Sequence, residues 1–226
     1  MAHYLRDKKI GTSTITEENV RALCNLFLAR QAVNSFALGS NDGEVKFAHF
    51  VVRFDNRGYK AYGTDDVMAY WQQAFKIERT VFSIDSVASL NSNKAVGSYA
   101  ELKLDVEEGN CWLTVSSDDR EWLDGTFNSI EQYLSSCKNK NSLVRTPWTP
   151  LITYVTGQAL ILVFSLWLAV KISPRLAVDN PVLVGFIILF FLYLPSWQVL
   201  HGQLIRYVGL AFPHIKFHKQ SRTLHW

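Results

Sequence analysis

The apolar residues of the first 137 positions follow two different periods, which predicts a domain built from both helices and strands. Apolar residues recur every three or four positions in residues 14–39, in residues 64–75, and from about Ser117 to Cys137. This spacing gathers them on one face of a helix. In the last of these helices the apolar stripe consists of Leu123, Phe127, Ile130, Leu134 and Cys137.

Polar residues mark where two of these helices should begin. Thr14 and Glu17 have the spacing of a capping box, and Thr16 is the alternative cap of the same helix. Thr64 or Asp65 should cap the second helix. The first helix should continue past Leu38 and stop at Gly39, because glycine commonly ends helices.

Strand character is clearest around residue 100. Ala100, Leu102 and Leu104 share one side of an extended segment, and Glu101 and Lys103 share the other, as in a sheet with one buried face. The expected strands are residues 44–54, 59–62, 77–90, 95–106 and 111–116. We therefore expect residues 1–137 to form an α+β domain, with an antiparallel sheet of about five strands and three helices.

The pattern changes after residue 150, where two long stretches carry no charge. Residues 151–170 and 181–200 are each 20 residues long. A helix of that length is about 30 Å long, which is the thickness of the hydrocarbon core of a bilayer. The linker between them has ten residues, so residues 151–200 are predicted to form a transmembrane α-helical hairpin. Aromatic residues that suit the membrane interface lie toward the ends of the runs: Trp148, Tyr154, Trp167, Tyr193 and Trp197.

Charge divides the chain at the same place. Residues 1–137 have 14 Lys and Arg against 19 Asp and Glu, a net of −5, and residues 138–226 have nine against one, a net of +8. The basic charge belongs to the apolar half, which indicates contact with anionic lipid and gives no reason to expect nucleic acid as a partner. Residues 138–150 are predicted to be a juxtamembrane linker and residues 201–226 a basic juxtamembrane tail. The candidates for lipid headgroup contact are Arg206, Lys216, Lys219 and Arg222.

The same basic residues predict the orientation in the membrane. The segments that flank the hairpin carry seven Lys and Arg, and the linker between the spans carries Lys171 and Arg175 beside Asp179. Lys and Arg accumulate on the cytoplasmic side, so both termini should be cytoplasmic in a multi-pass protein of the inner membrane. The first 18 residues have no apolar stretch, so we expect no secretory signal.

Catalytic and metal-binding motifs are missing from the sequence. It has no GxSxG, phosphate-binding loop, HExxH or GxGxxG pattern, so we expect no enzymatic activity and no cofactor. His214 and His218 have the spacing of two metal ligands on a helix, but their basic surroundings favour a lipid-facing tail, and His49 is interpreted as structural. The three cysteines, Cys24, Cys111 and Cys137, have no metal-binding spacing and are predicted to be packing residues without a disulfide.

Polar residues inside the two apolar runs are the candidate functional residues. Thr156, Gly157 and Gln158 lie in the first run, and Ser196 and Gln198 lie in the second, near the same cytoplasmic end. Amide side chains in hydrocarbon seek hydrogen-bond partners. This polar layer either holds one hairpin together, or links hairpins of several copies and lines a wet path.

The layout, a cytosolic α+β domain followed by two spans, is similar to that of bacterial membrane effectors, including those of antiviral defence. It is also similar to that of small regulatory subunits of membrane complexes. The first hypothesis is an effector whose cytosolic domain senses a protein or small-molecule trigger, and whose hairpins oligomerise to form a pore or disrupt the bilayer. The second is an accessory or scaffold subunit that tethers a partner. A membrane-anchored enzyme with scattered site residues is the third.

Overall fold

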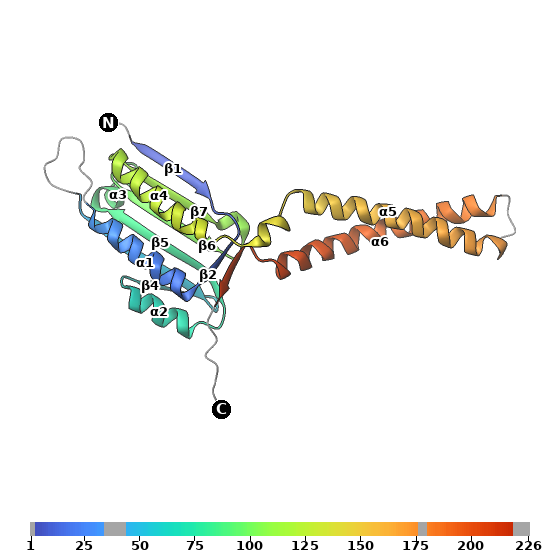
Figure 1. The fold of residues 1–226 in the computed structure, drawn as a ribbon, viewed down its shortest axis with the longest axis horizontal. Helices are drawn as coiled ribbons and strands as arrows, with labels where there is room; N and C mark the ends of the chain where they lie inside the picture. The colour runs from blue at the N-terminus through green and yellow to red at the C-terminus, as the bar shows by residue number, and fades with distance from the viewer. Residues whose placement is uncertain (1–2, 34–43, 176–179, 219–226) are drawn as a thin grey trace, which may run out of the picture. The chain divides into compact units, whose positions relative to one another are not determined.

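The computed structural model describes residues 3–33, 44–175 and 180–218, and the chain divides into two compact units (Figure 1). The first unit comprises residues 1–141 and 213–226, and the second comprises residues 142–212. The first unit is an α+β fold and the second is a helical hairpin, which confirms the predicted fold class.

The first unit is built on a six-stranded antiparallel sheet with the strand order β1-β7-β6-β5-β3-β4. Its strands are β1 (Tyr4–Lys9), β3 (Lys46–Phe54), β4 (Arg57–Ala61), β5 (Ile77–Ser86), β6 (Tyr99–Asp105) and β7 (Trp112–Ser117). The predicted alternation in β6 is confirmed: Ala100, Leu102 and Leu104 are buried, whereas Glu101 and Lys103 are half-buried on the other face.

Three helices, α1 (Glu17–Ala32), α2 (Thr64–Gln73) and α4 (Arg120–Ser136), pack on one face of this sheet (Figure 1). The core lies between them, where the ring of Phe82 in β5 is 5.6 Å from that of Phe27 and 5.8 Å from that of Phe50. The stripe predicted for the last helix, from Leu123 to Cys137, is buried throughout, which confirms its period. The opposite face of the sheet, here named the open face, has none of these three helices on it.

The caps agree with the predictions in part. Thr16 caps α1, and its hydroxyl accepts the amide of Asn19 at 3.2 Å. The prediction for α2 was wrong: Gly63 occupies the cap position and Thr64 and Asp65 already lie in the first turn, where the aspartate suits the helix dipole. Positions 38 and 39 lie outside the described residues, and within these α1 ends at Ala32.

The sheet has one strand more than expected, and the region predicted as a long strand at residues 77–90 ends in a short helix. The additional strand is β1, which pairs with β7 at the edge of the sheet. Edge strands are commonly charged, and the sequence of this one, YLRDKK, has few apolar residues. The pattern of apolar positions therefore did not predict a strand here. The short helix is α3 (Val87–Asn91), capped by the Ser86 hydroxyl, which accepts the amide of Ser89.

Residues 201–218 contain a helix end and a strand that the prediction of a basic juxtamembrane tail over residues 201–226 did not include. Residues 201–211 continue the second long helix, and Ile215–His218 form strand β8, which pairs in parallel with β2 (Ser13–Thr16) in the first unit. Ile215 is 1% exposed, and the ring of Phe217 contacts that of the buried Trp71 at 5.8 Å. The prediction followed the basic residues of this segment and did not recognise that Ile215 and Phe217 pack in the core of the first unit.

The second unit consists of two long antiparallel helices, α5 (Trp148–Ile172) and α6 (Pro181–Ala211). Both exceed the predicted 20-residue runs, and α6 continues through Pro195 without interruption. Both are long and apolar enough to cross a membrane. Only 17% of the most apolar window of the first span and 6% of that of the second is buried, so neither helix is a buried core helix within this chain.

Candidate functional site

A close contact between Gly157 and Trp197 sets the register of the hairpin. A Cβ atom at position 157 would lie closer than 3.0 Å to three ring atoms of Trp197, so only glycine leaves room for the indole. Further along the helices the ring of Phe164 lies 5.6 Å from that of Tyr193. This register brings residues 156–158 of α5 beside residues 196–198 of α6.

The predicted polar residues of this layer do not point toward one another. Gly157 is buried, whereas the side chains of Thr156, Ser196 and Gln198 are exposed on the outside of the hairpin. The Ser196 hydroxyl donates to the carbonyl of Leu192 one turn earlier, at 3.4 Å. At this depth the contact between Gly157 and the ring of Trp197 therefore lies inside the hairpin, and the exposed polar groups lie on its outer surface.

Gln158 has a different environment from Gln198. It is half-buried, and its Nε2 atom is shielded from solvent with no hydrogen-bond partner in the described part of the chain. The indole Nε1 of Trp197 and the hydroxyl of Ser165 are buried without a partner in the same hairpin. Each such group is costly in an apolar medium, so the isolated hairpin leaves polar groups unsatisfied.

The hairpin is fastened at the end where residues 148–155 meet residues 201–212. His201 Nε2 lies 3.0 Å from the carbonyl oxygen of Pro150 and 3.2 Å from the hydroxyl of Thr153. Arg145 donates to the carbonyls of Gly209, at 2.9 Å, and Phe212. These carbonyls end α6 and would otherwise lack partners, so Arg145 acts as a cap supplied by the segment that precedes α5.

In the first unit, a site that we name the junction gathers the two connections to the hairpin. It comprises residues 10–16, 137–141 and 213–218. Asn141, the last residue before the second unit, donates to the carbonyl of Pro213, the first residue after it, at 3.1 Å. The two connections therefore leave the first unit side by side.

Backbone hydrogen bonds from residues 10–16 hold both connections of the junction. The amide of Thr14 donates to the carbonyl of Cys137 at 2.9 Å, and the amide of Asn139 donates to the carbonyl of Thr12 at 3.2 Å. The amide of Ser13 donates to the carbonyl of His214 at 3.1 Å. One short segment thus binds the chain that leads into α5 and the chain that returns from α6.

His214 is the buried polar centre of the junction. It is 4% exposed, and its Nε2 donates to the carbonyl of Ile10 at 2.8 Å, while its Nδ1 is buried without a partner among the described residues. His218 lies at the exposed end of β8. Four residues of extended chain span about 13 Å, so the two histidines do not converge on a metal as they would on a helix. The described residues contain no group of three or more potential metal ligands.

The predicted lipid-contact residues are now divided between the two units. Arg206 is exposed on α6, and Lys216 is exposed on β8 in the first unit. Lys219 and Arg222 lie outside the described residues. The three cysteines are buried and form no disulfide, and burial raises the pKa of Cys24 to about 12 and also raises that of Cys137 in the junction.

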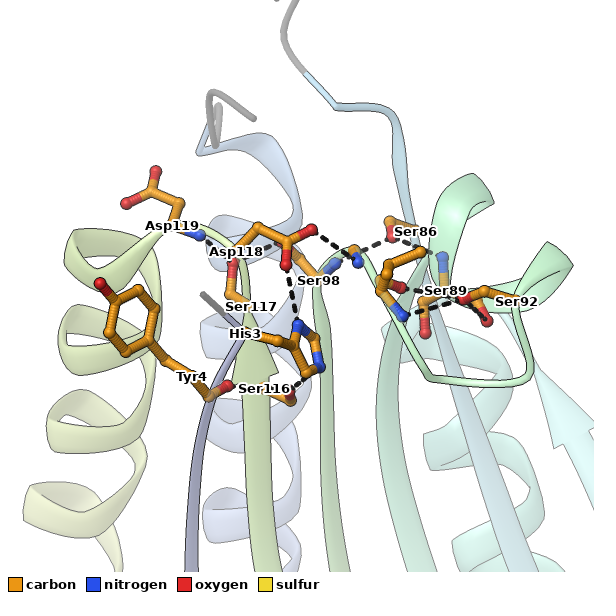
Figure 2. A network of polar contacts seen from close by, with 12 residues as sticks. His3, Tyr4, Ser86, Ser89, Ser92, Ser98, Ser116, Ser117, Asp118 and Asp119 are labelled. Atoms are coloured by element: carbon orange, nitrogen blue, oxygen red, sulfur yellow. Dashed lines mark hydrogen bonds and ion pairs between the residues drawn. The ribbon is translucent and has the colours of Figure 1, made fainter. Parts of the chain in front are cut away.

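A Ser–His–Asp arrangement, which the sequence did not reveal, lies where β1 begins beside the end of β7 (Figure 2). His3 Nδ1 is 2.9 Å from a carboxylate oxygen of Asp118, and its Nε2 is 2.6 Å from the hydroxyl of Ser116. The other oxygen of Asp118 accepts the amide of Gly97 at 2.9 Å. His3 lies 113 positions from Ser116 and 115 from Asp118, so no local motif could signal the arrangement.

The geometry of this network indicates a structural role. Ser116 is fully buried, and its hydroxyl lies 2.9 Å from the carbonyl oxygen of Tyr4 and 2.6 Å from His3 Nε2, so its single proton can go to either acceptor. A hydroxyl without exposed surface is not presented to a substrate as a nucleophile would be. The amide of Gly97, a possible donor to an oxyanion, is already bound by Asp118. The network fastens the start of β1 to β7 and to the loop before β6.

The chain matches no protein-family model, no curated protein and no solved structure. The functional argument therefore depends on the outward polar layer of the hairpin, the junction and the open face of the sheet.

Proposed function

We propose that this chain is a membrane-anchored effector, in which a cytoplasmic α+β unit responds to a trigger and the hairpins of several copies assemble in the bilayer. The observation that carries the proposal is the exposure of Thr156, Ser196 and Gln198 on the outside of the hairpin. Polar groups that face hydrocarbon gain hydrogen bonds from a neighbouring helix. A second copy offers the same groups at the same depth.

The pairing of β8 with β2 supports the proposed topology. The chain before α5 and the chain after α6 belong to one folded unit, so a hairpin that enters the membrane must return to the side from which it left. The basic residues near both connections favour the cytoplasm as that side. The assembled hairpins would then form a pore or disrupt the bilayer.

The test is a comparison of two glutamine substitutions in the full chain. Gln198→Leu keeps the length and hydrophobicity of α6 and removes only the outward amide. We expect it to lower the oligomeric mass in mild detergent and to reduce dye leakage from liposomes. Gln203→Leu is the matched control, because this exposed glutamine of the same helix lies beyond the predicted span.

The outcome for Gln158→Leu separates the two interpretations of the layer. Gln158 is half-buried and its amide nitrogen has no partner in the hairpin, so leucine should leave a single hairpin intact or stabilise it. Oligomers and leakage that are unchanged in both the Gln198 and the Gln158 variants would refute assembly through this layer and leave the hairpin as an anchor.

A second candidate function, a scaffold subunit that tethers a partner protein, is favoured by apolar side chains on the open face. Leu5 is 58% exposed, Phe47 48% and Trp112 41%. These side chains lie on three different strands of the open face and supply separate apolar contact points for a partner. Co-purification of a stoichiometric partner would favour the scaffold, whereas toxicity on overexpression that requires both helices would favour the effector.

A further inference from the structure

The open face of the sheet contains a hollow of about 520 Å³ that no mechanism described so far uses. Side chains of β3, β5, β6 and the β3–β4 turn line it together with Gly58 of β4, and the strand registers place these residues in adjacent rows. Small-molecule sites commonly have volumes of about 300–1,000 Å³. The hollow is therefore large enough for a ligand the size of a nucleotide.

Two arginines stand side by side at one end of this hollow. Arg53 of β3 and Arg79 of β5 are direct cross-strand partners, an arrangement that like charges disfavour. Each is fixed through its Nε atom by a carboxylate: Arg53 by Glu78 at 3.1 Å, and Arg79 by Asp105 at 2.6 Å. Because each guanidinium has five N–H donors, an ion pair at Nε orients the group and leaves further donors for an anion.

The same two arginines also border a second hollow of about 350 Å³, which Lys76 and Val106 help to line. Glu101, at the other end of the first hollow, is paired with Lys94 at 2.8 Å, so its charge is compensated. The cationic hydrogen-bond donors of the first hollow are thus the two guanidinium groups, each of which already has one carboxylate partner.

The rest of the lining is neutral and suits the remaining part of a small ligand. Val51 and Val81, which are cross-strand partners, form an apolar floor. Ser83 and Asn56 offer hydrogen-bonding groups. Burial lowers the pKa of His49, and the nearby charge of Lys60 lowers it further, so this imidazole is neutral at pH 7 and can both donate and accept.

We infer that this hollow binds a small phosphorylated molecule, with the phosphate on Arg53 and Arg79 and the uncharged portion on Val51 and Val81. Arginine recognises phosphate through two parallel hydrogen bonds, and a neighbouring apolar surface accommodates a ring. The inference gives the proposed sensing unit a ligand class. Its test measures binding alone, so its outcome is independent of whether the hairpins assemble.

The phosphate has two possible sources, a free nucleotide or the headgroup of a lipid, and the experiment separates them. The full chain in mild detergent, at 150 mM salt, is titrated calorimetrically with ATP, GTP, cyclic AMP and inositol trisphosphate, the soluble headgroup of a phosphoinositide. Tightest binding by a nucleotide or by inositol trisphosphate supports the site and identifies the source. No heat of binding from any of the four probes would overturn the inference.

Three substitutions locate the binding. Arg53→Gln should weaken the binding of the best probe at least tenfold, and Val51→Trp should abolish it by filling the hollow without changing the charge. Arg57→Gln, at an exposed position of the adjacent strand β4 outside the lining, is the matched control and should stay within twofold of wild type. Arg79 is not substituted, because its removal would leave the buried carboxylate of Asp105 without its ion-pair partner.

Thermal unfolding of each variant shows whether the fold is retained. Unchanged binding in well-folded Arg53→Gln and Val51→Trp would place the ligand elsewhere and overturn the inference. An equal loss in Arg57→Gln would do the same, because it would indicate diffuse attraction by the net charge of the unit.

Discussion

The fit of Trp197 against Gly157 gives the sharpest prediction for the hairpin. In Gly157→Ala the new methyl group would lie closer than 3.0 Å to three atoms of the indole, and a planar ring cannot bend away from it. The helices must therefore separate or the indole must leave its place. Overpacking of this kind costs about 1–3 kcal/mol. That corresponds to a shift of roughly 5- to 150-fold in the equilibrium between paired and separated helices.

Gly202 provides the matched control for this substitution. It lies on α6 and would present an added Cβ to open space, with no heavy atom within 4 Å. Both alanine variants gain the same helix propensity, about 1 kcal/mol in water, so their difference isolates the clash. The measurement is unfolding of the full chain by titration of mild-detergent micelles with SDS, followed by circular dichroism.

A second substitution tests the cause of the destabilisation. Trp197→Leu removes the ring that the methyl group meets, so the double variant should regain most of the stability lost in Gly157→Ala. A Gly157→Ala chain as stable as Gly202→Ala would refute the register of the hairpin. A loss that Trp197→Leu does not repair would show that the glycine serves another purpose.

Three further predictions concern the first unit and the topology. Ile215→Ala should lower the free energy of unfolding of the first unit by about 2–5 kcal/mol, because it leaves a cavity at a buried position. Lys216→Ala, at the exposed neighbouring position, is the control and should change it by less than about 0.5 kcal/mol. Thermal or urea unfolding measures both. Because burial raises the pKa of Cys24 from 9.0 to about 12, the folded state keeps a proton that the unfolded state loses. The contribution of this thiol to the free energy of unfolding is therefore complete below pH 9 and falls by up to about 1.4 kcal/mol per pH unit between pH 9 and 12. If the free energy of unfolding of Cys24→Ala changed with pH in the same way as that of the wild type over this range, the prediction would be contradicted. A reporter fused after residue 226 should be cytoplasmic and one inserted in residues 171–180 should not be, and a periplasmic signal from the C-terminal fusion would overturn the topology.

The sequence predicted those elements whose signal is local and repeated. The stripe of α4, the alternation of β6 and the two charge-free runs each concern residues within one element, so the period alone is enough to identify them. The position of an element within the fold leaves no such local signal. The charged strand β1 is stable because it lies at an edge, where Arg6 and Lys8 form ion pairs with Asp124 and Glu131 of α4. No pattern within six residues could show that these partners lie more than 110 positions away.

The candidate residues show the same limit. The two halves of the polar layer could be predicted to lie at one depth from their distances to the ends of the apolar runs. The sequence could not predict which of these residues face inward, because their orientation depends on the contact of Gly157 with Trp197. The basic tail was interpreted from its charge, yet Ile215 and His214 are buried in the first unit. A strand of four residues that pairs with another strand 200 positions away leaves almost no local signal.

The junction connects these observations to function. The hairpin is connected to the first unit by residues 137–141 and 213–214, and both segments are bonded to residues 10–16. Asn141 and Pro213 are also bonded to each other. A displacement of residues 10–16 therefore acts on both connecting segments together. This segment ends at Thr16, the cap of α1, and the α1 residues Val20, Leu23 and Phe27 are fully buried in the core. A change in the sheet thus has a continuous path, through α1 and its cap, to the two points at which the hairpin is attached.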